Sequence, residues 1–346
     1  MHQWSTSTYK SYCTIVEEVD LLQVAVPQLG LRYGFLMDGL FALAALELAT
    51  SPITTSNGHS KSAYVRAAME YYDRALSAFR VELVDITLEN HLALYMFSYL
   101  AGTFALVIPR VAPQSVSETI IGQSQSMSTL DSIKTMMKMM QGTGALIIKA
   151  WNWLREGPLQ IDKALAQEAP YDKLDEGTKA AMARLHAIND ARNKNDNGDK
   201  SNDDNNDADK TGDQEDRPPP AWTACKQAIL FLEENFAKEL EGSIKSICMS
   251  WLVRPWKEFH VLLEQSDPLA LLILMHWSVM LHRLDGEFFW ANKAGRNLTM
   301  DILAILNRTP AATPPEWREC MFWACEQVGL SALVQIVETQ RSALNE

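Results

Sequence analysis

The sequence predicts an all-α fold: a single multi-helix domain with a long disordered acidic insertion and an apolar internal pocket. Apolar residues recur at helical spacing on both sides of one acidic segment, and no stretch shows the strict alternation of a half-buried strand. Several segments are apolar on more than one face, which is typical of buried helices. With 346 residues, the chain is long enough to enclose a large core.

In the first part of the chain, four segments have the pattern of helices. Residues 34–49 are apolar almost all round, and residues 62–79 place aromatic and small residues on one stripe. A third helix over 91–106 is expected to stop at Pro109, because proline lacks the N–H that a helix interior uses. A Met-rich amphipathic run over 127–153 predicts the fourth.

The acidic segment divides the chain at residues 190–220. Residues 190–216 contain ten acidic side chains, four basic ones and only two Ala as apolar residues, so they carry a charge of −6. A segment of this kind cannot bury enough surface to offset its ordering entropy. We therefore expect 190–220 to be a disordered linker, and 1–189 and 221–346 to be two parts of the same helical domain.

Helical spacing continues after the linker, over residues 222–240. Asp-Pro at 267–268 marks a helix start, because Asp caps the N-terminus and proline suits the first helical position. Further helices are expected over 287–306 and over 313–328, where a Thr-Pro-Pro-Glu capping box opens the run. A last helix is expected after Gly329.

Composition limits the class of protein. The chain has 31 Lys and Arg against 43 Asp and Glu, a net charge of −12. Nucleic-acid binding depends on clustered positive charge, so no direct nucleic-acid contact is expected. The five Cys lack metal-ligand spacing and are too few for a disulfide framework, so we expect no metal, no cofactor and an intracellular, reducing location.

No targeting or membrane segment is expected. The opening residues lack the basic and apolar regions of a signal peptide. The most apolar stretch, 269–281, is interrupted by His276 and is shorter than the roughly 20 residues that a membrane helix needs.

Catalytic motifs give little signal. The cluster that most resembles a set of catalytic acids and bases is His282, Asp285 and Glu287, at the end of a very apolar helix. An apolar cavity would raise the pKa of Asp285 or Glu287 and make it a general acid. The structural alternative, which we favour, is a set of charged groups that closes a helix end.

Three further polar residues, Asp38, Glu47 and His91, lie within or at the ends of apolar helices. We expect each of them to be a hydrogen-bonded structural group, because buried polar side chains are almost always satisfied.

Three helices, over 34–49, 92–108 and 268–284, combine small residues with large ones. This combination indicates either tight helix packing or a cavity for a rigid apolar ligand, and periodicity does not separate the two. The candidate ligand-binding residues on these faces are Phe35, Leu36, Gly39, Phe97, Leu100, Phe104, Met275, Val279 and Met280.

Three sequence blocks carry a resemblance to a known family. They are YGFLMDGLFALAALELA (33–49), preceded by residues 1–10 and 26–29, ALSAFRVELVDITLENHLALYMFSYL (75–100) and LLILMHWSVMLHRLDGEFFW (271–290). A weaker fourth block covers residues 317–323. In this order they resemble the C-terminal regulatory region of fungal zinc-cluster transcription factors of the sterol uptake control type. The resemblance covers most of the chain outside residues 110–220.

The resemblance implies an all-α domain with a buried hydrophobic pocket. In sterol-responsive members, bound sterol keeps the factor in the cytosol, and loss of sterol sends it to the nucleus. This sequence departs from the family pattern: the six-Cys zinc cluster is missing, Asp38 and Glu47 stand where the family commonly has His, and Gly34 replaces a Pro.

Two functions follow as the leading hypotheses, beside a third, a protein-interaction domain with a filled core. The first is a regulatory domain, without its own DNA-binding module, that senses a sterol or terpenoid in the cytoplasm and nucleus; a homodimer is compatible with it. The alternative is a cofactor-independent cyclase or isomerase that uses the same pocket for a terpenoid or polyketide-like substrate. Such reactions can proceed by shape and a few hydrogen bonds.

Overall fold

The computed structural model describes residues 1–51, 60–112, 127–157, 168–198, 220–239, 247–254, 257–308 and 315–332. Throughout these segments the regular structure is helical, and none of them contains a strand. The predicted all-α class is therefore confirmed.

The chain forms two compact units, and each is built from separate stretches of the sequence. Unit 1 comprises Met1–Glu168, Glu241–Pro255 and Leu281–Ala294, and unit 2 comprises Ala169–Leu240, Trp256–Met280 and Gly295–Glu346. Both units thus draw residues from both sides of the acidic segment, and each is described below by itself.

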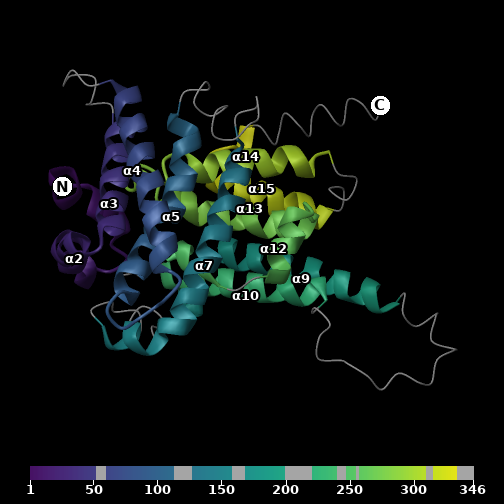
Figure 1. Ribbon diagram of the computed structural model, residues 1–346. Helices are drawn as coiled ribbons and strands as arrows, with labels where there is room; N and C mark the ends of the chain where they lie inside the picture. The colour runs from purple at the N-terminus through teal and green to yellow at the C-terminus, as the bar shows by residue number, and fades with distance from the viewer. Residues whose placement is uncertain are drawn as a thin grey trace. The chain divides into compact units, whose positions relative to one another are not determined.

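Unit 1 is a layer of long helices with a short helical N-terminal segment. Within it α3 packs against α4 and α5, α5 packs against α7, and α7 contacts α11 (Figure 1). The helices are α1 (His2–Thr6), α2 (Val26–Arg32), α3 (Gly34–Thr50), α4 (Lys61–Glu82), α5 (His91–Val111), α7 (Thr129–Glu156) and α11 (Cys248–Val253).

Side-chain caps set the start of two of these helices. The Ser60 hydroxyl accepts a hydrogen bond from the Ala63 N–H at the start of α4, and Ser128 does the same for Asp131 at the start of α7. Such caps satisfy N–H groups that have no partner inside the helix.

Helix α5 corrects one prediction, because it does not stop before Pro109. It continues through this proline to Val111, with the Ala112 N–H bonded to the Ile108 carbonyl. The Arg110 side chain also donates from Nε to the Leu106 carbonyl. Proline removes one helical hydrogen bond, and these neighbouring bonds hold the last turn in place.

Helix α5 is also long and apolar enough to cross a membrane by length and composition, with a mean hydropathy of 1.7. However, 72% of this stretch is buried inside the protein, as in the core helix of a folded domain. It is the single helix of this kind in the part of the chain that the structure describes.

Unit 2 is a second helical cluster, in which α10 packs against α9 and α12, and α15 packs against α9. The Asp267 side chain accepts hydrogen bonds from the N–H groups of Leu269 and Ala270, so the predicted helix start at 267–268 is confirmed. The helices are α9 (Glu176–Gly198), α10 (Ala221–Glu239), α12 (Lys257–Glu264), α13 (Pro268–Arg283), α14 (Ala294–Leu306) and α15 (Pro315–Gln327).

The predicted linker begins too early. Helix α9, which the sequence analysis did not identify, runs to Gly198, so the prediction of disorder is wrong for residues 190–198. Arg192 bonds to Asp267 at 3.0 Å and thereby ties this helical extension to unit 2. The rest of the predicted linker, 199–219, lies outside the described residues.

Helix α14 begins at Ala294 rather than at residue 287, because turns occupy the intervening residues. Gly286 and Lys293 both have a positive φ there, which a helix excludes. Helix α15 begins at Pro315, within the predicted range of 313–328, whereas Thr313, the predicted cap, and most of the expected last helix lie outside the described residues.

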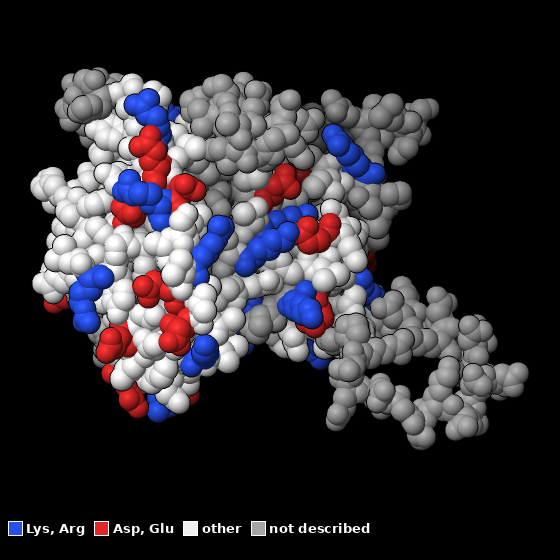
Figure 2. Space-filling view, in the orientation of Figure 1, with Lys and Arg blue, Asp and Glu red and all other residues white. Residues whose placement is uncertain are grey.

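Charge is mixed on the face of the protein in Figure 2. Basic and acidic side chains are interspersed there, and neither sign gathers into a patch.

Candidate functional site

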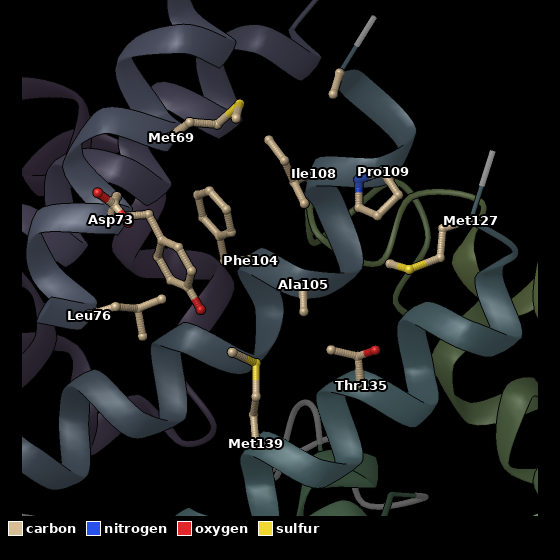
Figure 3. Close-up of a pocket in the computed structure, with 12 residues that line it drawn as sticks. Met69, Asp73, Leu76, Phe104, Ala105, Ile108, Pro109, Met127, Thr135 and Met139 are labelled. Carbon is tan, nitrogen blue, oxygen red and sulfur yellow. The ribbon is translucent and has the colours of Figure 1, made fainter. Parts of the chain in front are cut away.

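Unit 1 contains a pocket of about 500 Å³ between α4, α5 and α7, and it is partly open to solvent, since most of its described lining residues are half-buried or exposed. Side chains from the three helices point toward this common space (Figure 3). The lining residues are Met69, Tyr72, Asp73, Leu76, Phe104, Ala105, Ile108, Pro109, Ala112, Met127, Thr135 and Met139. Pockets of a few hundred Å³ with a mainly apolar lining are typical small-molecule sites.

An aromatic pair forms one wall of the pocket. The rings of Tyr72 and Phe104 stack with centroids 3.7 Å apart and an interplanar angle of 2°. The Tyr72 hydroxyl donates a hydrogen bond to the Ala101 carbonyl at 3.1 Å. Burial raises the pKa of Tyr72, so its hydroxyl remains protonated at physiological pH.

Three methionines contribute flexible apolar surface. Met69 comes from α4, Met139 from α7 and Met127 from the segment before α7 (Figure 3). The unbranched thioether side chain adapts to irregular shapes, and it is frequent where a binding surface accepts several related ligands.

Few polar groups reach the pocket. Asp73 lies on the exposed side of α4, and the Thr135 hydroxyl donates to the Asp131 carbonyl at 2.9 Å. Among the described lining residues, Asp73 is the one carboxylate, and no Lys, Arg or His is present. The arrangement can bind an apolar molecule by burial and orient it through a small number of acceptors.

Of the nine predicted ligand-binding residues, Phe104 is the one that lines this pocket. Phe35 and Phe97 are buried at the interface of α3, α4 and α5, with their ring centroids 5.7 Å apart. Gly39 lies against the same ring, because an added Cβ would come within 2.8 Å of a Phe97 carbon. These residues therefore form a closely packed contact.

The other predicted ligand-binding residues are buried away from the described lining. Leu36 of α3 and Leu100 of α5 are 0% and 1% exposed in unit 1. Met275, Val279 and Met280 belong to the part of α13 in unit 2, where each is at most 1% exposed. Within unit 1, one of the six predicted residues, Phe104, therefore lies in the described lining.

The candidate catalytic cluster lies at the end of α13. His282 Nδ1 is 3.9 Å from an Asp285 carboxylate oxygen, and Glu287 is exposed. Nearby, Arg110 donates to the backbone carbonyls of Trp290 and Asn292. Burial lowers the pKa of Arg110 to about 10, partly opposed by the charge of Asp285.

None of the three candidate catalytic residues lines the pocket. The structural alternative, an Arg–carboxylate arrangement that closes a helix end, stays a prediction.

The three polar residues predicted to be structural are all hydrogen-bonded or paired. Asp38 receives two bonds from Arg74, the shorter at 2.7 Å. Glu47 accepts from Ser7 at 2.7 Å and from two further N-terminal side chains, and His91 Nδ1 lies 2.7 Å from the Leu88 carbonyl. These predictions are confirmed.

The sequence analysis missed the residues that α4 and α7 contribute. Tyr72 and Leu76 belong to the apolar stripe recognised over 62–79, and Met139 belongs to the Met-rich run over 127–153. The signal was therefore present as two amphipathic helices, but the stripe alone does not show which of its residues face a cavity.

The described residues contain no cluster of metal ligands, and three of the buried cysteines carry no activated thiol. No group of three or more His, Cys, Asp or Glu side chains in them is arranged to hold a metal ion. The thiols of Cys225, Cys320 and Cys325 are buried, which raises the pKa of each to about 12 and keeps them protonated.

Comparison with known proteins identifies no relative. No family model matches the chain, no curated protein matches it, and no solved structure matches it. The pocket and the sequence resemblance are therefore the features of this protein that bear on its function.

Proposed function

We propose that this protein is a non-enzymatic regulatory domain that binds a sterol or another terpenoid-like molecule in the pocket between α4, α5 and α7. The observation that carries the proposal is a partly open pocket of about 500 Å³ with a mainly apolar lining between three helices of unit 1. Concave pockets of this size with a mainly apolar lining are typical sites for small molecules.

Burial of apolar surface supplies the binding energy in this proposal. Each Å² of apolar surface removed from water contributes roughly 25 cal/mol before the costs of association are subtracted. A rigid ring system loses little conformational entropy on binding, so it keeps more of this energy than a flexible chain does.

Regulation follows from differential binding. A ligand that contacts three helices favours the arrangement in which those helices surround it. We propose that occupancy of the pocket in this way controls movement between cytoplasm and nucleus, as the family resemblance implies, and that contact with DNA is made by another chain.

The catalytic alternative requires a proton donor at the ligand. Asp285 and Glu287 are absent from the pocket lining, and the carboxylate that does line it, Asp73, is on the exposed side of α4. No observation favours catalytic turnover over binding. We therefore propose that the protein binds its ligand as a sensor and does not convert it.

The test is titration of the purified protein with a fluorescent sterol, together with native mass spectrometry for a co-purifying apolar compound. The Ala105→Leu variant places a larger side chain in the pocket and should weaken sterol binding by at least about tenfold, because the ligand and the new side chain compete for one space.

The matched control is Ala78→Leu, the same exchange at an exposed position of α4. It should bind the sterol as the unmodified protein does. Equal binding by the Ala105→Leu variant, or no saturable binding by any form, would contradict the proposal.

A further inference from the structure

The corner between α4 and α5 exposes apolar side chains. Two valines and a leucine come from the end of α4 and the turn after it, a second leucine comes from the end of α2, and each is between 62% and 84% exposed. The members of this corner patch are Leu31, Val81, Val84 and Leu88. Single exposed apolar side chains are ordinary on protein surfaces, whereas several gathered together mark an interaction site.

A hydrogen bond brings the end of α2 to this corner. The Tyr33 hydroxyl donates to the Glu89 carbonyl at 2.8 Å. This bond holds Leu31, two residues before Tyr33, close to the turn that carries Leu88. The patch thus combines two segments that lie far apart in the sequence, and both belong to unit 1.

The turn that carries the patch is held in one conformation by the buried Asn90. Its side chain accepts from the Thr87 N–H at 2.8 Å and donates to the Asp85 carbonyl at 2.9 Å. His91 Nδ1 lies 2.7 Å from the Leu88 carbonyl and fixes the end of the turn. A backbone that is already ordered loses little conformational entropy on association, so the exposed side chains are prepared for a partner.

The rim of the patch carries both signs of charge. The exposed charged residues next to its members in the sequence are Arg32, Arg80, Glu82, Asp85 and Glu89. In a two-fold symmetric contact a surface meets a rotated copy of itself. Acids of one protomer can then face bases of the other only if the surface holds both, and the corner meets this condition.

A partner of a single charge sign fits the corner less well. A basic partner would meet the two arginines, and an acidic partner or an anionic membrane surface would meet the three carboxylates. Like charges that are brought together across an interface oppose binding. A second copy of this chain is therefore the occupant that the rim favours.

We propose that the corner patch is the interface of a two-fold symmetric homodimer of this chain. The apolar side chains of the patch form the centre of the contact, and the charged residues form its rim. No member of the patch is among the described lining residues of the pocket, so this inference is independent of the proposed function.

The first test is the oligomeric state of the full chain. Sedimentation velocity over protein concentrations from about 1 to about 100 μM should show a monomer–dimer equilibrium. The Val84→Ser variant should weaken the dimer by about tenfold, because it removes an apolar group from the centre of the contact. Val84 is exposed, so the variant should keep its fold, which circular dichroism checks.

The matched control is Val261→Ser, the same exchange at an exposed position of α12 in unit 2. It should dimerise as the unmodified protein does. A protein that remains monomeric at the highest concentration overturns the proposal, as does equal dimerisation by Val84→Ser or an equal loss in the control.

A pair of charge variants tests the partner. The Asp85→Lys/Glu89→Lys variant makes the rim basic, and the Arg32→Glu/Arg80→Glu variant makes it acidic. Each should dimerise at least about tenfold more weakly than the unmodified protein, because like charges then face each other.

An equal mixture of the two charge variants should form a heterodimer, which native mass spectrometry distinguishes from both homodimers by mass. This result requires that the same corner of both protomers takes part. If the mixture pairs no better than either variant alone, the corner is not an interface between copies of this chain and the proposal fails.

Discussion

The N-terminal half of α5 is packed tightly against α3, whereas its C-terminal half borders the pocket. In the first half, the Phe97 ring fills the space that Gly39 leaves, and the Phe79 ring lies 4.8 Å away, centroid to centroid. In the second half, Phe104 stacks on Tyr72, and a space of about 500 Å³ remains beside them.

The difference shows that composition alone does not separate a closed interface from an open one. Both halves combine large rings with small residues. At Gly39 the ring points into the gap that the missing side chain leaves. Beside Ala105 the rings of Phe104 and Tyr72 stack on each other, and among the described residues a space remains next to them.

The strongest test of this comparison is a pair of Phe→Ala exchanges. Phe97→Ala should lower the free energy of unfolding by about 3–5 kcal/mol, because it creates a new cavity in a closed core. Phe104→Ala should cost less, about 1–3 kcal/mol, since this ring borders a pocket that already exists, so its removal enlarges that pocket instead of creating a new enclosed cavity.

Urea unfolding followed by circular dichroism measures both values. An equal or larger loss for Phe104→Ala would show that the pocket half of α5 is as tightly packed as the Phe97 half, and the comparison would fail.

A smaller effect is expected from exchanging glycines. Gly39→Ala places a Cβ within 2.8 Å of the Phe97 ring, so the ring must move. The overpacking exceeds the gain in helix propensity, and the net loss should be about 1 kcal/mol.

The matched glycine control is Gly142→Ala in α7, where nothing lies within 4 Å of the new Cβ. It should stabilise the protein by up to about 1 kcal/mol through helix propensity alone. Thermal or urea unfolding gives the sign of the change in stability for both variants. Stabilisation by Gly39→Ala would contradict close packing at this site.

The smallest effect is expected from a pair of Tyr→Phe exchanges. Tyr12 is buried, and its hydroxyl shares a hydrogen bond of 2.8 Å with Thr103 Oγ1 of α5, so Tyr12→Phe should cost about 1 kcal/mol. Tyr72→Phe removes a bond to a carbonyl inside α5 and should cost about 0.5 kcal/mol. Reversal of this order in urea unfolding would contradict the assignment of Tyr72 to the open half.

Much of the fold followed from the sequence. The helices over 34–49, 62–79 and 222–240 lie within a few residues of α3, α4 and α10. Helical periodicity and caps are local properties, so a single sequence carries them. The same local evidence missed α9, whose polar C-terminal turns are tied to unit 2 by the distant Asp267.

The sequence by itself determined the helical class, the apolar faces and the structural role of polar residues such as Asp38 and Glu47. Only the tertiary structure decided that Phe97 is enclosed while Phe104 borders a space. The reason is geometric. Periodicity reports which face of a helix is apolar, but a cavity is the volume left between faces of three helices, and that volume depends on which side chains meet.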